Sequence, residues 1–172
     1  IDWNVTAKMG TPYIKKYIEE RELSVILAVD MSASGFFGSG EKNKNETMLE
    51  VASLLAFSAI KNNDKVGLLL FTDKIEFYLH QKSGRLYVLR VIRELIEIKP
   101  ESKGTNISLA LEILLKTVKK KSVIFLISDF IQKESNYPHL LNLLNKKHDI
   151  IAVRILDKVE KSWQFSGHYM LS

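Results

Sequence analysis

Short apolar runs alternate with longer segments of helical periodicity along this chain, and that alternation restricts its fold more than any other feature. The runs are "ELSVILAVD" (22–30), "DKVGLLLFT" (64–72), "KIEFYLHQ" (74–81), "SVIFLISDF" (122–130) and "DIIAVRIL" (149–156). Nearly uninterrupted apolar runs predict strands covered on both faces, as in parallel sheets. The run at 74–81 alternates polar and apolar residues, which predicts a short antiparallel edge strand.

The segments between these runs repeat their apolar residues every three or four positions, which predicts amphipathic helices. They cover residues 45–63, 85–98, 107–118 and about 137–147. Asn45 and Thr105 stand where N-caps would begin two of the helices. Strands alternating with helices predict an α/β fold: a doubly wound, mainly parallel, Rossmann-like sheet with helices on both faces.

The length and composition fit one compact domain. The chain has 172 residues, 46% of them hydrophobic, which allows a sizeable core. We expect a polar segment at 1–22 leading into the domain, the domain itself at 23–157, and a C-terminal tail at 158–172 that is cut short. No apolar segment approaches the eighteen or so residues that cross a bilayer. The sequence starts at Ile1, without a methionine and without the pattern of a signal peptide. We therefore expect a soluble piece of a longer protein.

Charge and cysteine content exclude several classes of site. The 25 basic and 20 acidic residues give a formal net charge of +5, but the basic residues are scattered, so we predict no nucleic-acid partner. The chain has no cysteine, which excludes disulfides, thiolate metal ligands and a cysteine nucleophile.

Polar side chains with oxygen ligands gather where the predicted strands end. Asp30 ends the first strand, and Ser32 and Ser34 follow at a spacing of two, which points alternate side chains the same way. Thr105 and Asp129 belong to two further loops that reach the same sheet edge. Two carboxylates and three hydroxyls form an incomplete all-oxygen shell of the kind that Mg²⁺ accepts, with Mn²⁺ or Ca²⁺ as alternatives.

Each of these residues also has a structural interpretation. Asp30 could close a turn, and the two serines could bond to nearby backbone. Thr105 taken singly is more typical of a helix cap, and Ser128 with Asp129 could close another turn. Only the combination at three strand ends favours a metal site.

Other chemistries fit the sequence less well. An aspartyl-phosphate enzyme usually has a second carboxylate two residues after the first, where this chain has Ser32. The loop "GFFGSGEKN" lacks the Lys-Ser/Thr ending of a phosphate-binding loop. The chain has no GxSxG motif with a positioned histidine. We assign no catalytic residue.

The same residues resemble a known signature. "DMSAS" is similar to the DxSxS motif of the von Willebrand factor A domain, "GTN" to the second loop of that domain and "SDF" to the third. The resemblance implies a metal-ion-dependent adhesion site in which Asp30, Ser32, Ser34, Thr105 and Asp129 hold the cation directly or through water.

A narrower resemblance extends over nearly the whole chain. The segment before the first strand, with "NDKVGLLLF", "SVIFLISDF" and "HDIIAVRILDKVE", resembles the bacterial family called domain of unknown function fifty-eight. The resemblance implies a cytoplasmic domain, often behind an amino-terminal membrane anchor, and a MoxR-type AAA+ ATPase as a partner.

These observations predict a metal-dependent protein interaction module rather than an enzyme. An Asp or Glu carboxylate of a partner protein would complete the coordination of the cation. Two alternatives stay open at this stage. One is a hydrolase or phosphatase that uses the cation to activate water. The other is a scaffold whose site has lost its metal role.

Overall fold

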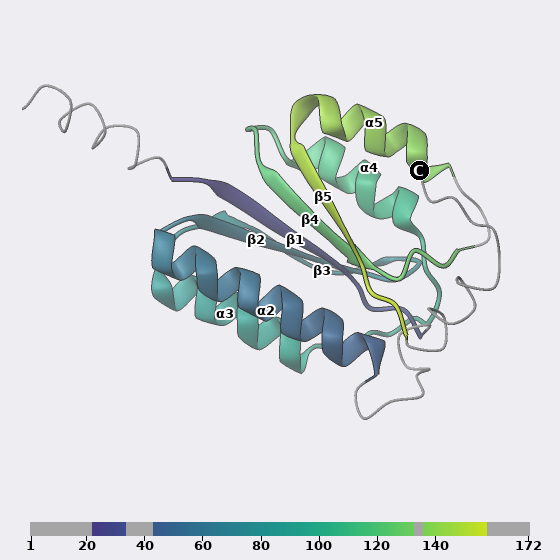
Figure 1. The fold of residues 1–172 in the computed structure, drawn as a ribbon, viewed down its shortest axis with the longest axis horizontal. Coiled ribbons are helices and arrows are strands. Elements are labelled where there is room, and N and C mark those ends of the chain that lie inside the picture. Colours follow the sequence, from purple (N-terminus) through teal and green to yellow (C-terminus); the bar gives the residue numbers. More distant parts are fainter. Residues whose placement is uncertain (1–21, 34–42, 133–135, 158–172) are drawn as a thin grey trace, which may run out of the picture.

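The computed structural model describes residues 22–33, 43–132 and 136–157. Within those residues, a five-stranded sheet lies between two layers of helices (Figure 1). The strands are β1 (Ser24–Asp30), β2 (Lys65–Phe71), β3 (Ile75–Lys82), β4 (Val123–Ser128) and β5 (Asp149–Arg154). The helices are α2 (Lys44–Asn62), α3 (Arg85–Glu97), α4 (Ile107–Thr117) and α5 (Tyr137–Lys147).

The sheet has the order β3-β2-β1-β4-β5. β1 pairs in parallel with both β2 and β4, and β4 pairs in parallel with β5. β3 is antiparallel to β2 and forms one edge, as the alternating sequence of 74–81 predicted. The connections from the central β1 run to β2 on one side and return to β4 on the other. The carboxyl ends of β1 and β4 therefore meet at a topological switch point, where ligands bind in open α/β sheets.

The uninterrupted apolar sequence of β1 reflects burial on both faces of the sheet. Val25, Leu27 and Val29 pack in one core cluster with residues of α2 and α3. Ile26 and Ala28 pack in the other cluster with residues of α4 and α5. Figure 1 shows the two helix pairs on opposite sides of the sheet, so the prediction of a doubly wound fold is confirmed.

Both predicted N-caps were wrong by a small shift. Helix α2 is capped by Asn43, whose side chain accepts a 2.9 Å hydrogen bond from the N–H of Glu46. Asn45 instead lies inside the first turn. Helix α4 is capped by Asn106, whose side chain accepts a 3.0 Å hydrogen bond from the N–H of Leu109. Asparagine is a stronger cap than threonine, and the shift leaves the Thr105 hydroxyl without a capping role.

Several predictions fall partly or wholly outside the described residues. Ser34 lies there, as do the tail at 158–172 and all but the last residue of the segment at 1–22. The proposed domain limits therefore stay predictions. Among the residues that the structure describes, no helix is both long and apolar enough to cross a membrane.

Candidate metal centre

Asp30, the first predicted ligand, lies at the end of β1 with only 1% of its surface exposed. Its Oδ1 accepts a 2.9 Å hydrogen bond from the N–H of Ser32, and its Oδ2 accepts a 2.6 Å bond from the hydroxyl of Ser128. Burial raises the pKa of Asp30, the hydrogen bonds from the two serines oppose that rise, and the charge of Asp129 adds to it. A nearby positive charge would favour the ionised carboxylate.

Asp129 follows β4 directly and is fully buried. Its Oδ1 accepts a 3.0 Å hydrogen bond from the N–H of Ile131. The next residue, Phe130, has a left-handed backbone with φ of 58°, which is rare for a bulky residue. The N–H of Phe130 donates a 2.9 Å bond to the Ser128 hydroxyl oxygen. This strained turn fixes the position of the Asp129 carboxylate at the carboxyl end of β4. Such strain is common at functional sites.

One backbone hydrogen bond joins the first and second predicted ligand loops, and another joins the second loop to the turn after β2. The N–H of Ala33 donates to the carbonyl of Lys103 at 3.0 Å, and the N–H of Asn106 donates to the carbonyl of Thr72 at 2.9 Å. Ser32, next to Ala33 in the chain, is buried, and Thr105, between Lys103 and Asn106, is half-buried. The structure therefore brings together Asp30, Ser32, Asp129 and the loop that carries Thr105.

Glu76 of β3 forms hydrogen bonds with the loop that carries Thr105. One carboxylate oxygen of Glu76 accepts a 2.8 Å hydrogen bond from the Thr72 hydroxyl and a 3.1 Å hydrogen bond from the N–H of Ser102. The other oxygen accepts a 3.1 Å hydrogen bond from the N–H of Glu101. Burial pushes the pKa of Glu76 upward, but these three hydrogen bonds and the charge of Lys74 together hold it below its usual value.

Gly104, directly before Thr105, lies against the side chain of Asp73. A Cβ at this position would meet Asp73 Oδ2 at 2.8 Å, closer than real Cβ contacts allow. The close approach explains why a residue without a side chain occupies this position. It also ties the place of the second ligand loop to the turn that follows β2.

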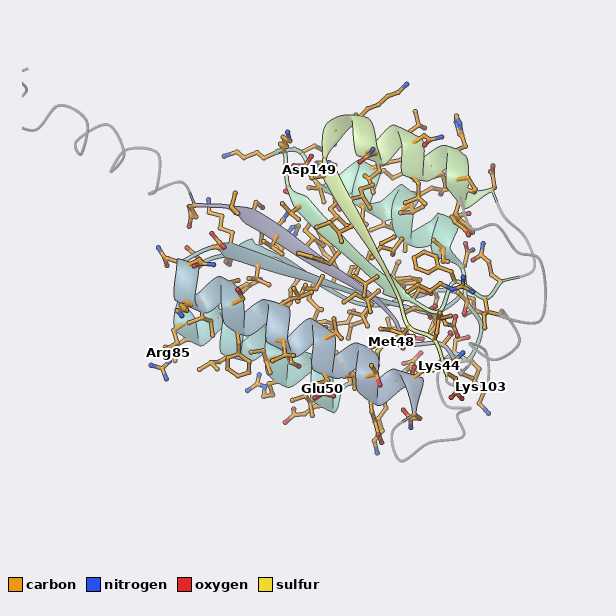
Figure 2. The ribbon with its side chains drawn as sticks, in the orientation of Figure 1. Lys44, Met48, Glu50, Arg85, Lys103 and Asp149 are labelled. Carbon is orange, nitrogen blue, oxygen red and sulfur yellow. The ribbon has the colours of Figure 1, made fainter. Side chains whose placement is uncertain are left out.

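Lys44, in the first turn of α2, was not predicted from the sequence. Only 6% of its surface is exposed, and its Nζ lies 3.4 Å from Oδ2 of Asp129. Figure 2 shows Lys44 and Lys103, which belongs to the second predicted ligand loop, at the same end of the molecule, opposite Asp149 and Arg85. A lysine at a helix N-terminus opposes the helix dipole, and this unfavourable position is the one feature of the sequence that could have drawn attention to Lys44.

The next residue along α2, Asn45, is also buried at 6% exposure. Neither polar atom of its side chain has a hydrogen-bond partner in the part of the chain that the structure describes. A buried amide without hydrogen bonds lowers the free energy of unfolding, because its lost hydration is not replaced. In a native protein such a group calls for an explanation. Asn45 is thus a buried polar residue next to Lys44 in the first turn of α2, and its amide has no partner that the described residues provide.

The donor set at this sheet edge fits a divalent cation with open coordination positions. The described ligands are oxygen atoms, which hard cations prefer. The formal charges of Asp30, Asp129 and Lys44 sum to −1, and a cation would balance that buried charge. In the described residues, no group of three or more histidine, cysteine or acidic side chains is placed to hold a metal. A cation here would therefore depend on hydroxyl groups and water beside the two aspartates.

The described residues have an α/β fold that resembles the von Willebrand factor A fold. The crystal structure of the conserved hypothetical protein BatB from Bacteroides thetaiotaomicron has the same fold, with a TM-score of 0.64 and 20% sequence identity. That match covers 77% of this chain and 66% of BatB. The VWA domain of SpRpn10 matches with a TM-score of 0.56 and 16% identity, over 79% of this chain and 77% of that domain.

The chain belongs to the family described as "Protein of unknown function DUF58", which it matches over residues 1–172. A curated relative, the "Uncharacterized protein Rv1480" of Mycobacterium tuberculosis, is 25% identical over 159 residues. That match covers 91% of this chain and 50% of the relative. The chain thus spans about half the length of the curated relatives it matches.

Proposed function

We propose that this domain is a metal-dependent protein interaction module and not an enzyme. Asp30, Ser32, Ser34, Thr105 and Asp129 would hold Mg²⁺, or Mn²⁺ or Ca²⁺, at a metal-ion-dependent adhesion site. The observation that carries the proposal is the pair of buried carboxylates, Asp30 and Asp129, at neighbouring strand ends of the switch point.

The chemistry of the site supports binding rather than turnover. A bound divalent cation supplies an electrophilic position that an Asp or Glu carboxylate of a partner protein can fill. The residues of this chain fix that position: the Ser32 and Ser128 contacts orient Asp30, and the turn at Phe130 orients Asp129. Both carboxylates accept hydrogen bonds from the backbone of their own turns, which fixes their orientation for coordinating a cation.

The setting of the domain is a proposal on the family resemblance. A MoxR-type AAA+ ATPase would be a partner, and the domain would act as an accessory factor in the assembly or maturation of other proteins. We place the domain in the cytoplasm, as part of a longer protein that a membrane anchor holds. The half-length match to the curated relatives agrees with a longer protein.

Metal binding is tested first on the isolated chain. Isothermal titration with MgCl₂ should give a saturable signal, and millimolar Mg²⁺ should raise the melting temperature, because a ligand that binds only the folded state stabilises it. Asp30→Asn should lose both effects. Asp149→Asn is the matched control, because Asp149 is exposed at the other end of the sheet. If Mg²⁺, Mn²⁺ and Ca²⁺ leave the wild-type melting temperature unchanged, the adhesion site is refuted.

Partner binding is tested by affinity capture from the native cell with and without a chelator. The wild-type chain should retain proteins in Mg²⁺ that are lost with chelator and with Asp30→Asn, but kept with Asp149→Asn. Identical sets of captured proteins under all four conditions would reject a metal-mediated mechanism and favour a scaffold. A phosphatase screen covers the enzyme alternative, since metal-dependent turnover that Asp30→Asn abolishes would contradict the proposed function.

A further inference from the structure

The contact between Lys44 and Asp129 puts a positive charge of the protein itself where a metal cation would be needed. Both partners are buried, with 6% and 0% of their side chains exposed. The pair is formed across the fold, from the first turn of α2 to the end of β4. A lysine at a helix N-terminus gains nothing from the helix dipole, so the contact with the carboxylate offsets an otherwise unfavourable position.

The contacts of the two carboxylates differ in how easily they can be exchanged. Three of the four oxygens accept bonds of 2.6 to 3.0 Å from residues within the ligand turns. Oδ2 of Asp129 instead faces Lys44 at 3.4 Å, which is longer than the usual distance of about 2.7–2.9 Å for an ammonium and a carboxylate. Lys44 also reaches the site on a flexible four-carbon side chain. The contact between Lys44 and Oδ2 of Asp129 is therefore the one of the four that can break without unfolding a turn.

We propose that the Lys44 ammonium is a built-in counter-ion of the site that competes with a divalent cation for Asp129. This inference rests on the proposed metal site. In the absence of metal, Lys44 neutralises Asp129 and keeps the buried carboxylate paired. When a divalent cation binds, Lys44 moves away from Oδ2, because two positive charges cannot share one carboxylate oxygen without strong repulsion. Lys44 thereby lowers the affinity for metal and limits occupancy to conditions in which the cation is abundant.

The test compares Lys44→Met with Lys61→Met. Both substitutions remove one positive charge from α2 and keep a side chain of similar length. Lys61 is exposed in the last turn of the helix, about 25 Å along the axis from Lys44, and at that distance its charge is largely screened. Mg²⁺ affinity is measured by isothermal titration, and the melting temperature is measured with and without Mg²⁺.

Lys44→Met should bind Mg²⁺ at least about fivefold more tightly than wild type, the lower end of usual coupling between two ligands. Without metal it should melt at a lower temperature, because it leaves Asp129 buried and unpaired, and saturating Mg²⁺ should restore most of that loss. Lys61→Met should match wild type in Mg²⁺ affinity and in the rise of melting temperature that Mg²⁺ produces, although loss of a cation from the last turn of α2 lowers its melting temperature slightly in both conditions. Lys44→Arg keeps the charge and offers a forked donor, so it should stay folded without metal and gain no affinity.

Failure of this inference can be told apart from failure of the proposed function. If wild type binds Mg²⁺ and Lys44→Met binds it equally or more weakly, Lys44 does not compete and the inference is overturned. If Lys44→Arg gains as much affinity as Lys44→Met, the charge is irrelevant and the inference is also overturned. Binding by Lys44→Met but not by wild type would support the competition and contradict the proposed function. If neither chain binds a divalent cation, both proposals are wrong.

Discussion

The hydroxyl of Ser128 donates a 2.6 Å hydrogen bond to Oδ2 of Asp30 across a separation of 98 residues. The two residues end neighbouring parallel strands, β4 and β1. The same hydroxyl oxygen accepts a hydrogen bond from the N–H of Phe130, so one serine links the first predicted ligand loop to the third. Within the described structure this is a direct side-chain contact between the two carboxylate-bearing strand ends.

Removing the Ser128 hydroxyl should destabilise the domain. Ser128 is fully buried. Ser128→Ala removes one hydrogen bond from Asp30 and leaves the N–H of Phe130 without its partner. We expect the free energy of unfolding to fall by about 1.5–3 kcal/mol, the range for a hydrogen bond to a charged group, measured by urea denaturation. Ser58→Ala, on the exposed side of α2, should change it by less than about 0.5 kcal/mol. A loss at Ser128 no larger than at Ser58 would mean that the contact contributes nothing.

A side chain at Gly104 should disturb the loop that carries Thr105. In Gly104→Ala the new Cβ meets Asp73 Oδ2, so the loop or Asp73 must shift. We expect a loss of about 1 kcal/mol in the free energy of unfolding, at the low end for overpacking because Asp73 is exposed. Adding Asp73→Ala should recover part of that loss, with a coupling energy of about 0.5 kcal/mol or more. Strictly additive effects would show that the two side chains do not meet.

Glu76 should make stability depend on pH in the acidic range. Its pKa is lowered in the folded state, so the unfolded chain binds more protons below about pH 4.5. The stabilisation is therefore present above that pH and is lost as the pH falls through the lowered pKa. Urea midpoints of wild type and Glu76→Gln should differ most at pH 7 and converge toward pH 3. Glu112→Gln, exposed on α4, should show no such convergence. A constant difference at every pH would assign the effect to hydrogen bonds and not to charge.

Asn45 should be a site where the protein can be made more stable. The side chain is buried and its amide has no hydrogen-bond partner among the described residues, so Asn45→Leu removes the desolvation cost. We expect the free energy of unfolding to rise by about 1–2 kcal/mol. Asn62→Leu, exposed at the other end of α2, is the control and should leave it nearly unchanged. A loss of stability in Asn45→Leu would show that the amide makes contacts that the described residues do not reveal.

The fold could be predicted because its signals are local. The uninterrupted apolar run of β1 predicted that this strand is buried on both faces. The alternation of polar and apolar residues in β3 predicted its position at the sheet edge. The helix starts were displaced by one or two residues, because Asn43 and Asn106 stand next to other residues that can also cap. A choice between adjacent caps depends on backbone geometry that the sequence pattern does not contain.

The candidate site could be predicted only in part. Asp30, Ser32, Thr105 and Asp129 could be assigned to one edge of the sheet because each ends, follows or joins a predicted element there; their role as metal ligands stays a prediction. Lys44 and Ser128 were not assigned to it, because their partners lie 85 and 98 residues away along the chain. Lys44 gave one local sign, a positive charge in the first turn of a helix, but nothing local identified Asp129 as the carboxylate that it meets.

The sequence by itself determined which segments are strands or helices, which strands are apolar on both faces, and which oxygen-bearing side chains stand at strand ends. These properties follow from apolar periodicity and from the residues next to each element. Only the tertiary structure decided how the charges at that edge are paired. The order of the strands brings Asp30 beside Ser128 and turns the start of α2 toward Asp129. Such pairings depend on which strands become neighbours, and no local pattern in the chain specifies that.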